Sequence, residues 1–305
     1  MAASVDGEPG PGGVETSTMP TPGTPAAPHR YGQGSGHGNV AGLDGLRGVA
    51  VGLVVLFHLS VPGFAGGFLG VDVFFVLSGF LITSLLLAEH HRHGRISLSG
   101  FWSRRVRRLM PALLVLVLAL TVWVAVVATE SQKASLRGDL LATVGYVANW
   151  RIIATSSYFE AVGDPSPVQH AWSLAIEEQF YLVWPLIVVA LLVWLGSRAS
   201  RSSRGSRSSR VALLALATTL AVVSAALLAW RWAPEALDRA YMGTDTRIFE
   251  PLVGAAAAVL LTVTSRRPGR VLTIAAVLVA SVAAVAVVAT ARGEQGWYFR
   301  GGAVL

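Results

Sequence analysis

The sequence predicts an all-α protein whose helices form a bundle that crosses a membrane several times. Of its 305 residues, 53% are hydrophobic and only 13% are charged, which is too apolar for an ordinary soluble domain. Apolar stretches close to the ~20 residues that a helix needs to cross a bilayer recur along the chain. Arginine-rich segments separate several of them, as loops on one side of a membrane would.

Seven apolar stretches are long enough to be membrane-spanning helices. In chain order they are 44–62, 69–88, 109–128, 171–195, 211–230, 245–264 and 271–290. An eighth, 139–153, is short and contains Asn149 and Arg151, which favours a partial or interfacial helix. The chain stops at "GWYFRGGAVL", where an outer loop would lead into another span. We therefore expect a bundle that is incomplete at its C-terminal end.

The first 40 residues differ in composition from the rest of the chain. They are rich in Gly, Pro, Ser and Thr and have few apolar side chains, so they cannot bury enough surface to fold. They show no short apolar run with a cleavage site, so we expect no cleavable signal peptide. The predicted organisation is a disordered tail over 1–40 and a transmembrane domain over 41–305.

The distribution of basic residues predicts the orientation. Three loops hold fourteen arginines, whereas the loops on the other side hold six basic residues. Because short cytoplasmic loops carry the excess of Lys and Arg, we expect these three loops and the N-terminus to be cytoplasmic in a multi-pass inner (plasma) membrane protein. Arginines divided among loops do not form one continuous basic surface, so we expect no nucleic acid partner. The absence of cysteine excludes disulfides and thiolate metal sites.

The first predicted span, "GLDGLRGVAVGLVVLFHL", carries ionisable residues, which are expensive inside a membrane and are candidates for function. Arg47 and His58 are eleven positions apart, three full turns plus about 20°, so they lie on one stripe of the helix. Their separation along the axis is about 16 Å. The alternative is a snorkelling arginine and a packed histidine, and the shared stripe makes that less favourable.

The segment "HAWSLAIEEQFYLVWP", 170–185, places several polar and aromatic side chains on one face of a second helix. They lie within about 60° of one direction, and they are His170, Ser173, Glu177, Tyr181 and Trp184. Glu178 lies about 100° from Glu177 and belongs to a neighbouring face. A carboxylate inside an apolar span must find a partner or lose its charge. The alternative role of Glu177 is an ion pair that joins two helices.

Two further segments place charges near predicted outer helix ends. "GGFLGVDVFFVLSGFLI", 66–82, combines glycines suited to close helix packing with Asp72. "YMGTDTRIFEPLVG", 241–254, contains Asp245, Arg247 and Glu250, for which a salt bridge is the simplest explanation.

The segment "FWSRRVRRLMP", 101–111, places four arginines just before a cytoplasmic helix start. They are Arg104, Arg105, Arg107 and Arg108. Guanidinium groups bind phosphates bidentately, and anionic lipid headgroups are the alternative ligand. The nearby "HHRH", 90–93, lies in a basic loop that lacks carboxylate or thiolate partners, so we predict no metal site there.

Taken together, these motifs resemble the integral-membrane acyltransferase 3 family. The similarity is carried by "RGVAVGLVVLFH", "GVDVFFVLSGFLI", "FWSRRVRRLMPAL", "HAWSLAIEEQFYLVWP" and "YMGTDTR", in the family's order over about 40–305. The resemblance implies transfer of an acyl group, usually acetyl, from cytoplasmic acyl-CoA to an extracytoplasmic saccharide or glycolipid. It also implies about ten spans, more than this chain contains.

The resemblance assigns catalytic roles to His58, Arg47 and Glu177. His58 would act as general base on the acceptor hydroxyl, and an arginine would stabilise the developing oxyanion. We assign the four arginines of 104–108 to the phosphates of acyl-CoA, and we expect no permanently bound cofactor. The residues assigned to substrate binding are Asp72, Ser78, His170, Trp172, Ser173, Tyr181, Asp245 and Arg247.

The rival hypothesis is a multi-span transporter of a polar or anionic substrate, because aligned intramembrane charges also mark substrate paths. The sequence shows no inverted repeat or paired broken helices, which a transporter would more often have. A purely structural membrane protein would not explain polar residues that share faces on several helices.

Overall fold

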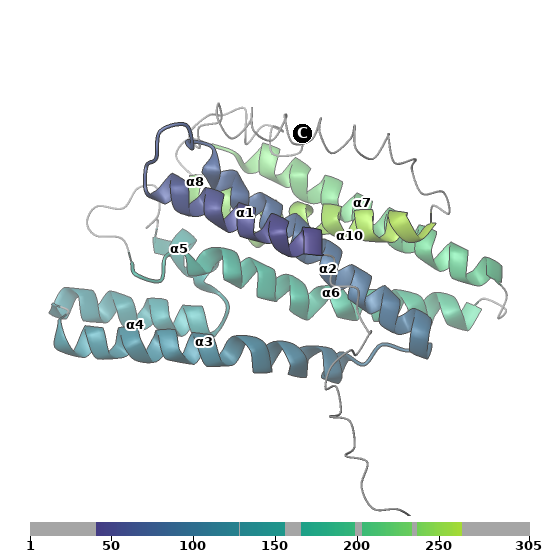
Figure 1. Ribbon diagram of the computed structural model, residues 1–305, viewed down its shortest axis with the longest axis horizontal. Coiled ribbons are helices and arrows are strands. Elements are labelled where there is room, and N and C mark those ends of the chain that lie inside the picture. Colours follow the sequence, from purple (N-terminus) through teal and green to yellow (C-terminus); the bar gives the residue numbers. More distant parts are fainter. Residues whose placement is uncertain (1–40, 128, 156–165, 199–202, 234–236, 264–305) are drawn as a thin grey trace, which may run out of the picture. The chain divides into compact units, whose positions relative to one another are not determined.

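The computed structural model describes residues 41–127, 129–155, 166–198, 203–233 and 237–263 (Figure 1). Within this described part the chain is helical and forms no strand, so the all-α prediction is confirmed. The α-helices are α1 Ala41–His58, α2 Gly70–His93, α3 Leu98–Val126, α4 Glu130–Val144, α5 Ala148–Thr155, α6 Ala171–Arg198, α7 Ser203–Arg231, α8 Leu237–Met242, α9 Thr244–Arg247 and α10 Phe249–Val263. The predicted tail, 1–40, and the predicted seventh span, 271–290, lie outside the described residues.

Five helical segments of the described chain are long and apolar enough to cross a membrane. They are Gly67–His93, Leu98–Val126, Ala171–Ser197, Arg207–Arg231 and Thr244–Val263. They coincide with five of the predicted spans. The first predicted span is shorter than expected, because its helix ends at His58 rather than at 62 and its apolar part covers only Gly45–His58.

The third span differs from its prediction at its start. α3 begins at Leu98 rather than at 109, so the arginine cluster lies within the helix and not just before it. The Ser97 side chain caps this start by accepting a hydrogen bond from the Gly100 amide at 3.2 Å. Arginine is a good helix former, so the charged residues continue the helix into the polar region. α2 ends just before, at His93, and is capped by Gly94, whose φ of 66° suits a residue without a Cβ.

The short apolar segment at 139–153 contains a break. α4 ends at Val144 and α5 begins at Ala148, and between them Tyr146 has a φ of 54°. A tyrosine rarely adopts this left-handed conformation, so the surrounding structure must hold it there. Neither α4 nor α5 is among the helices long enough to span, in agreement with the prediction of a partial helix.

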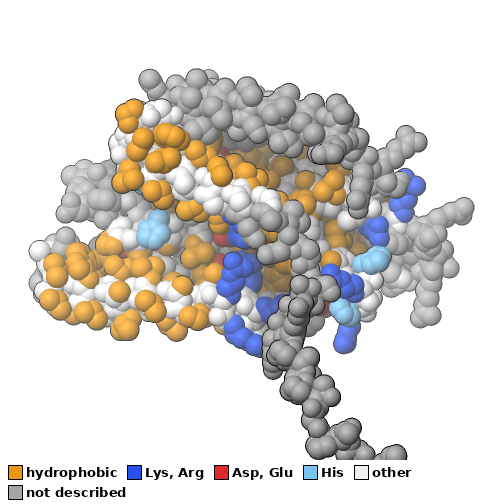
Figure 2. Space-filling view, viewed as in Figure 1, with side chains coloured by type: hydrophobic (Ala, Val, Ile, Leu, Met, Phe, Trp, Pro, Cys, Tyr) orange, Lys and Arg blue, Asp and Glu red, His pale blue; other side chains and the backbone are white. Residues whose placement is uncertain are grey.

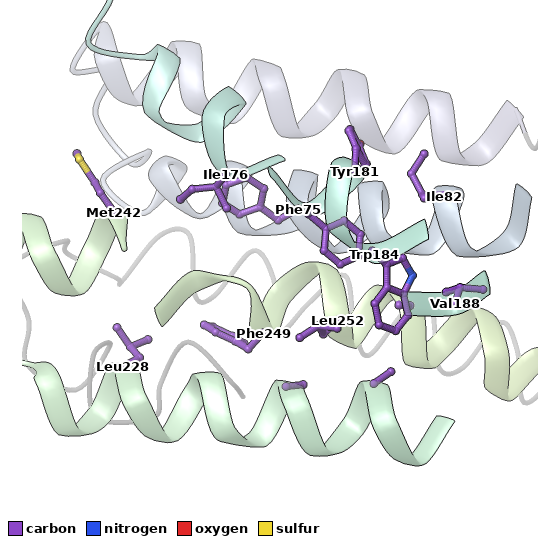
Figure 3. Close-up of a cluster of buried hydrophobic side chains, with 14 of the residues drawn as sticks. Phe75, Ile82, Ile176, Tyr181, Trp184, Val188, Leu228, Met242, Phe249 and Leu252 are labelled. Atoms are coloured by element: carbon purple, nitrogen blue, oxygen red, sulfur yellow. The ribbon is translucent and has the colours of Figure 1, made fainter. Parts of the chain in front are cut away.

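α2 packs most extensively against α10, and close backbone approach makes this possible. A Cβ on Gly79 would lie 2.7 Å from the Cα of Pro251, and one on Gly254 would lie 2.8 Å from the Phe80 amide nitrogen. Side chains of α2, α6, α7 and α10 form the main buried cluster (Figure 3). By contrast, α3 leaves apolar side chains such as Leu114, Val115 and Leu118 at least 60% exposed, as a lipid-facing surface would.

Candidate functional site

A pocket of about 330 Å³ lies between α1, α2, α3 and α6. Its α1 wall is formed by Ala50, Val51, Val54 and Val55. These residues fill the stripe between Arg47 and His58 at helical spacing, so the face that the sequence singled out does border a cavity. Phe74 and Phe75 of α2 and Leu113 and Leu116 of α3 supply further apolar walls, while His170, Ser173 and Glu177 contribute polar groups.

Arg47 and His58 flank this wall of the pocket. The Arg47 guanidinium carbon lies 4.9 Å from the centre of the Phe74 ring, so this half-buried cation rests on an aromatic face. His58 is exposed at the end of α1, and its Nδ1 lies 2.8 Å from the Val54 carbonyl oxygen. Because a carbonyl only accepts, Nδ1 donates in this contact, and Nε2 is the ring nitrogen left to act on a substrate.

Glu177 is held between α2 and α6. Its carboxylate accepts hydrogen bonds from the Ser78 hydroxyl of α2 and from the Tyr181 hydroxyl one turn further along α6. Ser78 and Tyr181 are both buried, so these two donors fix the carboxylate, which also lines the pocket. Ser78 and Tyr181, two of the residues assigned to substrate binding, thus meet at Glu177.

Glu178 points elsewhere, as its helical position predicts. It accepts a hydrogen bond at 3.0 Å from the guanidinium of Arg105, which also lies over the Tyr181 ring at 3.2 Å from its centre. Arg105 therefore connects α3 to α6 beside the carboxylate of Glu177. Of the four arginines assigned to phosphate binding, it is the one most enclosed by protein.

The other three arginines of the cluster are exposed. Arg104 has a side chain that is 66% exposed and lies 3.7 Å from Glu89, and Arg107 donates to the Ser103 hydroxyl at 2.9 Å. Arg108 is exposed as well. Figure 2 shows Lys and Arg side chains gathered in the middle of the face between the apolar surfaces of α1 and α3. These exposed arginines can reach a soluble phosphate group.

Asp72 and Arg247, also assigned to substrate binding, form a buried ion pair although 175 positions separate them. Arg247 is fully buried, and it also lies 2.9 Å from Glu250 and 4.8 Å from the centre of the Tyr241 ring. The salt bridge expected within 241–254 is confirmed for Arg247 and Glu250. The pair joins α2 to the segment that leads into α10, outside the lining of the pocket.

Of the remaining predicted residues, His170 and Ser173 line the pocket, whereas Trp172 and Asp245 do not. His170 lies in the turn before α6, where its carbonyl accepts from the Ser173 hydroxyl at 3.3 Å, and both residues line the pocket. Trp172 is buried and packs against Phe75, with ring centres 6.2 Å apart. Asp245 accepts from Arg239 at 2.7 Å, away from the pocket lining.

A buried amide network was not anticipated from the sequence. Gln179 donates to the Tyr146 carbonyl at 2.8 Å and to the Asn149 side chain at 3.1 Å, and Asn149 donates to the Thr244 hydroxyl at 2.9 Å. The network ties α5 and the start of α9 to α6, next to Glu178. Partial burial raises the pKa of the Tyr146 hydroxyl above its ordinary value, and the charge of Glu178 raises it further. The sequence feature that could have indicated this network is Asn149, a polar residue in an apolar segment.

No group of three or more His, Asp or Glu side chains that could hold a metal ion occurs among the residues that the structure describes. The polar side chains that line the pocket are Thr143, His170, Ser173 and Glu177, a set that suits proton transfer and the binding of hydroxyl groups.

Comparison with known proteins identifies the family of the chain. Residues 40–304 match the family described as "Acyltransferase domain". The peptidoglycan O-acetyltransferase OatA of Listeria monocytogenes is 40% identical over 221 residues, which are 72% of this chain and 33% of OatA. YrhL of Bacillus subtilis, whose name marks it as a candidate peptidoglycan O-acetyltransferase, is 40% identical over 226 residues, 73% of this chain and 34% of its own.

This chain thus spans about a third of the length of the curated relatives that it matches. No solved structure matches it. The family match covers the described helices and every residue of the candidate site. The chain belongs to the acyltransferase domain family, as a multi-pass membrane member of it.

Proposed function

We propose that the protein transfers an acyl group, most simply acetyl, from acyl-CoA to a hydroxyl of a cell-wall saccharide, with His58 as the general base. The observation that supports this most is the pocket whose α1 wall lies between Arg47 and His58 and whose α6 wall carries Glu177. Relatives named as peptidoglycan O-acetyltransferases support a saccharide acceptor. The exposed arginines of α3 support a donor that carries phosphates.

In the proposed reaction, Nε2 of His58 accepts the proton of the acceptor hydroxyl while that oxygen attacks the thioester carbonyl. Arg47 lies about 16 Å from His58 along the axis of α1, so it helps to position the phosphate-bearing donor and does not contact the reacting carbonyl. The C–S bond then breaks, and the CoA thiolate takes the proton from His58 as it leaves. Glu177, held by Ser78 and Tyr181, accepts a hydrogen bond from a second hydroxyl of the saccharide and orients it.

The test is acetyl-CoA consumption by the purified protein, with and without a peptidoglycan fragment as acceptor. His58→Ala should reduce transfer by about two to four orders of magnitude and leave CoA binding unchanged. His93→Ala, an exposed histidine at the end of α2, is the matched control and should have no effect. A His58→Ala protein that binds CoA and transfers at the parental rate would remove His58 from the mechanism.

The same assay tests the donor site. Replacing the exposed arginines at 104, 107 and 108 with Gln should raise KM for acetyl-CoA with little change in kcat, because each lost contact to phosphate is worth about 1.5–3 kcal/mol. If KM stays constant and only membrane insertion or lipid preference changes, these arginines bind headgroups and not the donor.

The proposed direction of transfer requires that the arginine-rich helix ends be cytoplasmic. Ser208, near the start of α7, should then lie inside, and Thr129, between α3 and α4, should lie outside. We expect a membrane-impermeant thiol reagent to label Thr129→Cys in whole cells and to leave Ser208→Cys unlabelled until the cells are opened. The reverse pattern would reject this orientation, and with it a donor from the cytoplasm.

A further inference from the structure

A second, larger groove of about 1140 Å³ lies among α2, α6, α7 and α10, near the arginine-rich ends of α2, α6 and α7. Its walls are apolar over much of their length, with Leu87, Leu192, Val193 and Leu261 among them. The basic side chains that line it are His90, His91, Arg92, Arg95 and Arg210. Figure 2 shows Lys, Arg and His side chains gathered at the right-hand end of the face, where these helices end.

Among the described residues, the ionisable side chains that line this groove are all basic. None of the described residues that line it is acidic. Glu89, next to His90 in the sequence, is engaged elsewhere, because its carboxylate accepts from the Ser97 amide at 2.9 Å and lies 3.7 Å from Arg104. Arg210 is held in place by donating to the Thr262 carbonyl at 3.1 Å, which ties α7 to α10. A ligand of this groove must therefore bring negative charge.

The groove is separate from the candidate active site. Among the described residues, none lines both cavities. On α6 the active-site pocket ends at Glu177 and the groove begins at Val189, twelve positions further, which is about 18 Å along the helix. A phosphate held by the arginines of the groove would therefore lie well away from Glu177. The groove is thus a candidate site for a ligand other than the reacting substrates.

We propose that this groove binds an anionic phospholipid of the surrounding bilayer. Its phosphate would contact the guanidinium groups of Arg92, Arg95 and Arg210, which match phosphate oxygens bidentately. One acyl chain would lie along Leu192, Leu261 and their neighbours, where it covers apolar surface. Basic pockets between transmembrane helices are suited to such headgroups. The volume, above the usual ~300–1,000 Å³ of small-molecule pockets, also fits a two-chain amphiphile.

Lipid retention in nanodiscs tests the proposal without reference to acyl transfer. The wild-type protein is placed in phosphatidylcholine containing phosphatidylglycerol, and native mass spectrometry counts the lipids that stay bound. We expect preferential retention of one phosphatidylglycerol. Arg92→Gln/Arg95→Gln should reduce that retention at least tenfold, and so should Leu192→Trp, which fills the apolar wall without changing charge. Circular dichroism checks that each variant is folded.

The matched control is Lys133→Gln/Arg137→Gln, which removes two positive charges from α4, outside the groove. It should retain phosphatidylglycerol as the wild type does. The proposal is overturned if either groove variant retains the lipid at the wild-type level, if the control loses it equally, or if phosphatidylcholine is retained as well as phosphatidylglycerol. Displacement of the bound lipid by added acetyl-CoA would likewise overturn it, because the groove would then be a donor site.

Discussion

Removing Glu178 should destabilise the protein much more than removing Glu89, although each carboxylate is the partner of one arginine in the same cluster. Glu178 lies 3.0 Å from Arg105, and their side chains are 12% and 22% exposed. Glu89 lies 3.7 Å from Arg104, with side chains that are 22% and 66% exposed. The two pairs therefore differ in both distance and solvent access.

These differences set the expected free energies. At 3.0 Å and an effective dielectric constant of about 20, the attraction is roughly 5.5 kcal/mol before desolvation. For Arg104 and Glu89, at 3.7 Å and a dielectric constant close to that of water, the attraction is roughly 1 kcal/mol. Desolvation offsets much of the larger value, so we expect a coupling of about 1.5–3 kcal/mol for Arg105 with Glu178. The exposed pair should give about 0.2–1 kcal/mol.

A double-mutant cycle measures each coupling directly. The unfolding free energy in detergent is compared among the wild type, Arg105→Gln, Glu178→Gln and the double variant, and the same cycle is run for Arg104 and Glu89. Equal couplings in the two cycles, or a larger one for the exposed pair, would refute the view that Arg105 joins α3 to α6. Such a result would mean that solvent screens the charge of Arg105 as it does that of the exposed Arg104.

Two further substitutions test the packing of α2 on α10. Gly79→Ala should cost about 1–3 kcal/mol of stability, because the new Cβ meets the backbone of Pro251. Gly52→Ala is the control, because its Cβ has open space around it and should not destabilise the protein. Thermal unfolding in detergent compares the two variants, and equal melting temperatures would contradict the close approach of α2 to α10. Arg247→Gln should cost about 3–5 kcal/mol in the same assay, because it leaves Asp72 and Glu250 without their shared cation. A loss below 1 kcal/mol would show that solvent reaches the cluster.

The sequence alone was sufficient for the fold class and for the faces of single helices. Five described spans lie where hydropathy placed them, because a bilayer accepts only long apolar segments whose backbone is hydrogen-bonded internally. The stripe from Arg47 to His58 and the face around Glu177 both border the same pocket. Helical periodicity determines which side chains of one helix point together, and it can be read without knowing any neighbour.

Only the tertiary structure decided which faces meet. Asp72 pairs with Arg247, and Arg105 pairs with Glu178, across large separations in the chain. Hydropathy could not predict either pair, because all the spans are similarly apolar and their order in the sequence does not determine their neighbours. The close packing of α2 on α10 brings the first pair together, and the second pair requires α3 to lie against α6. Such contacts depend on shape complementarity between distant segments, which local composition does not record.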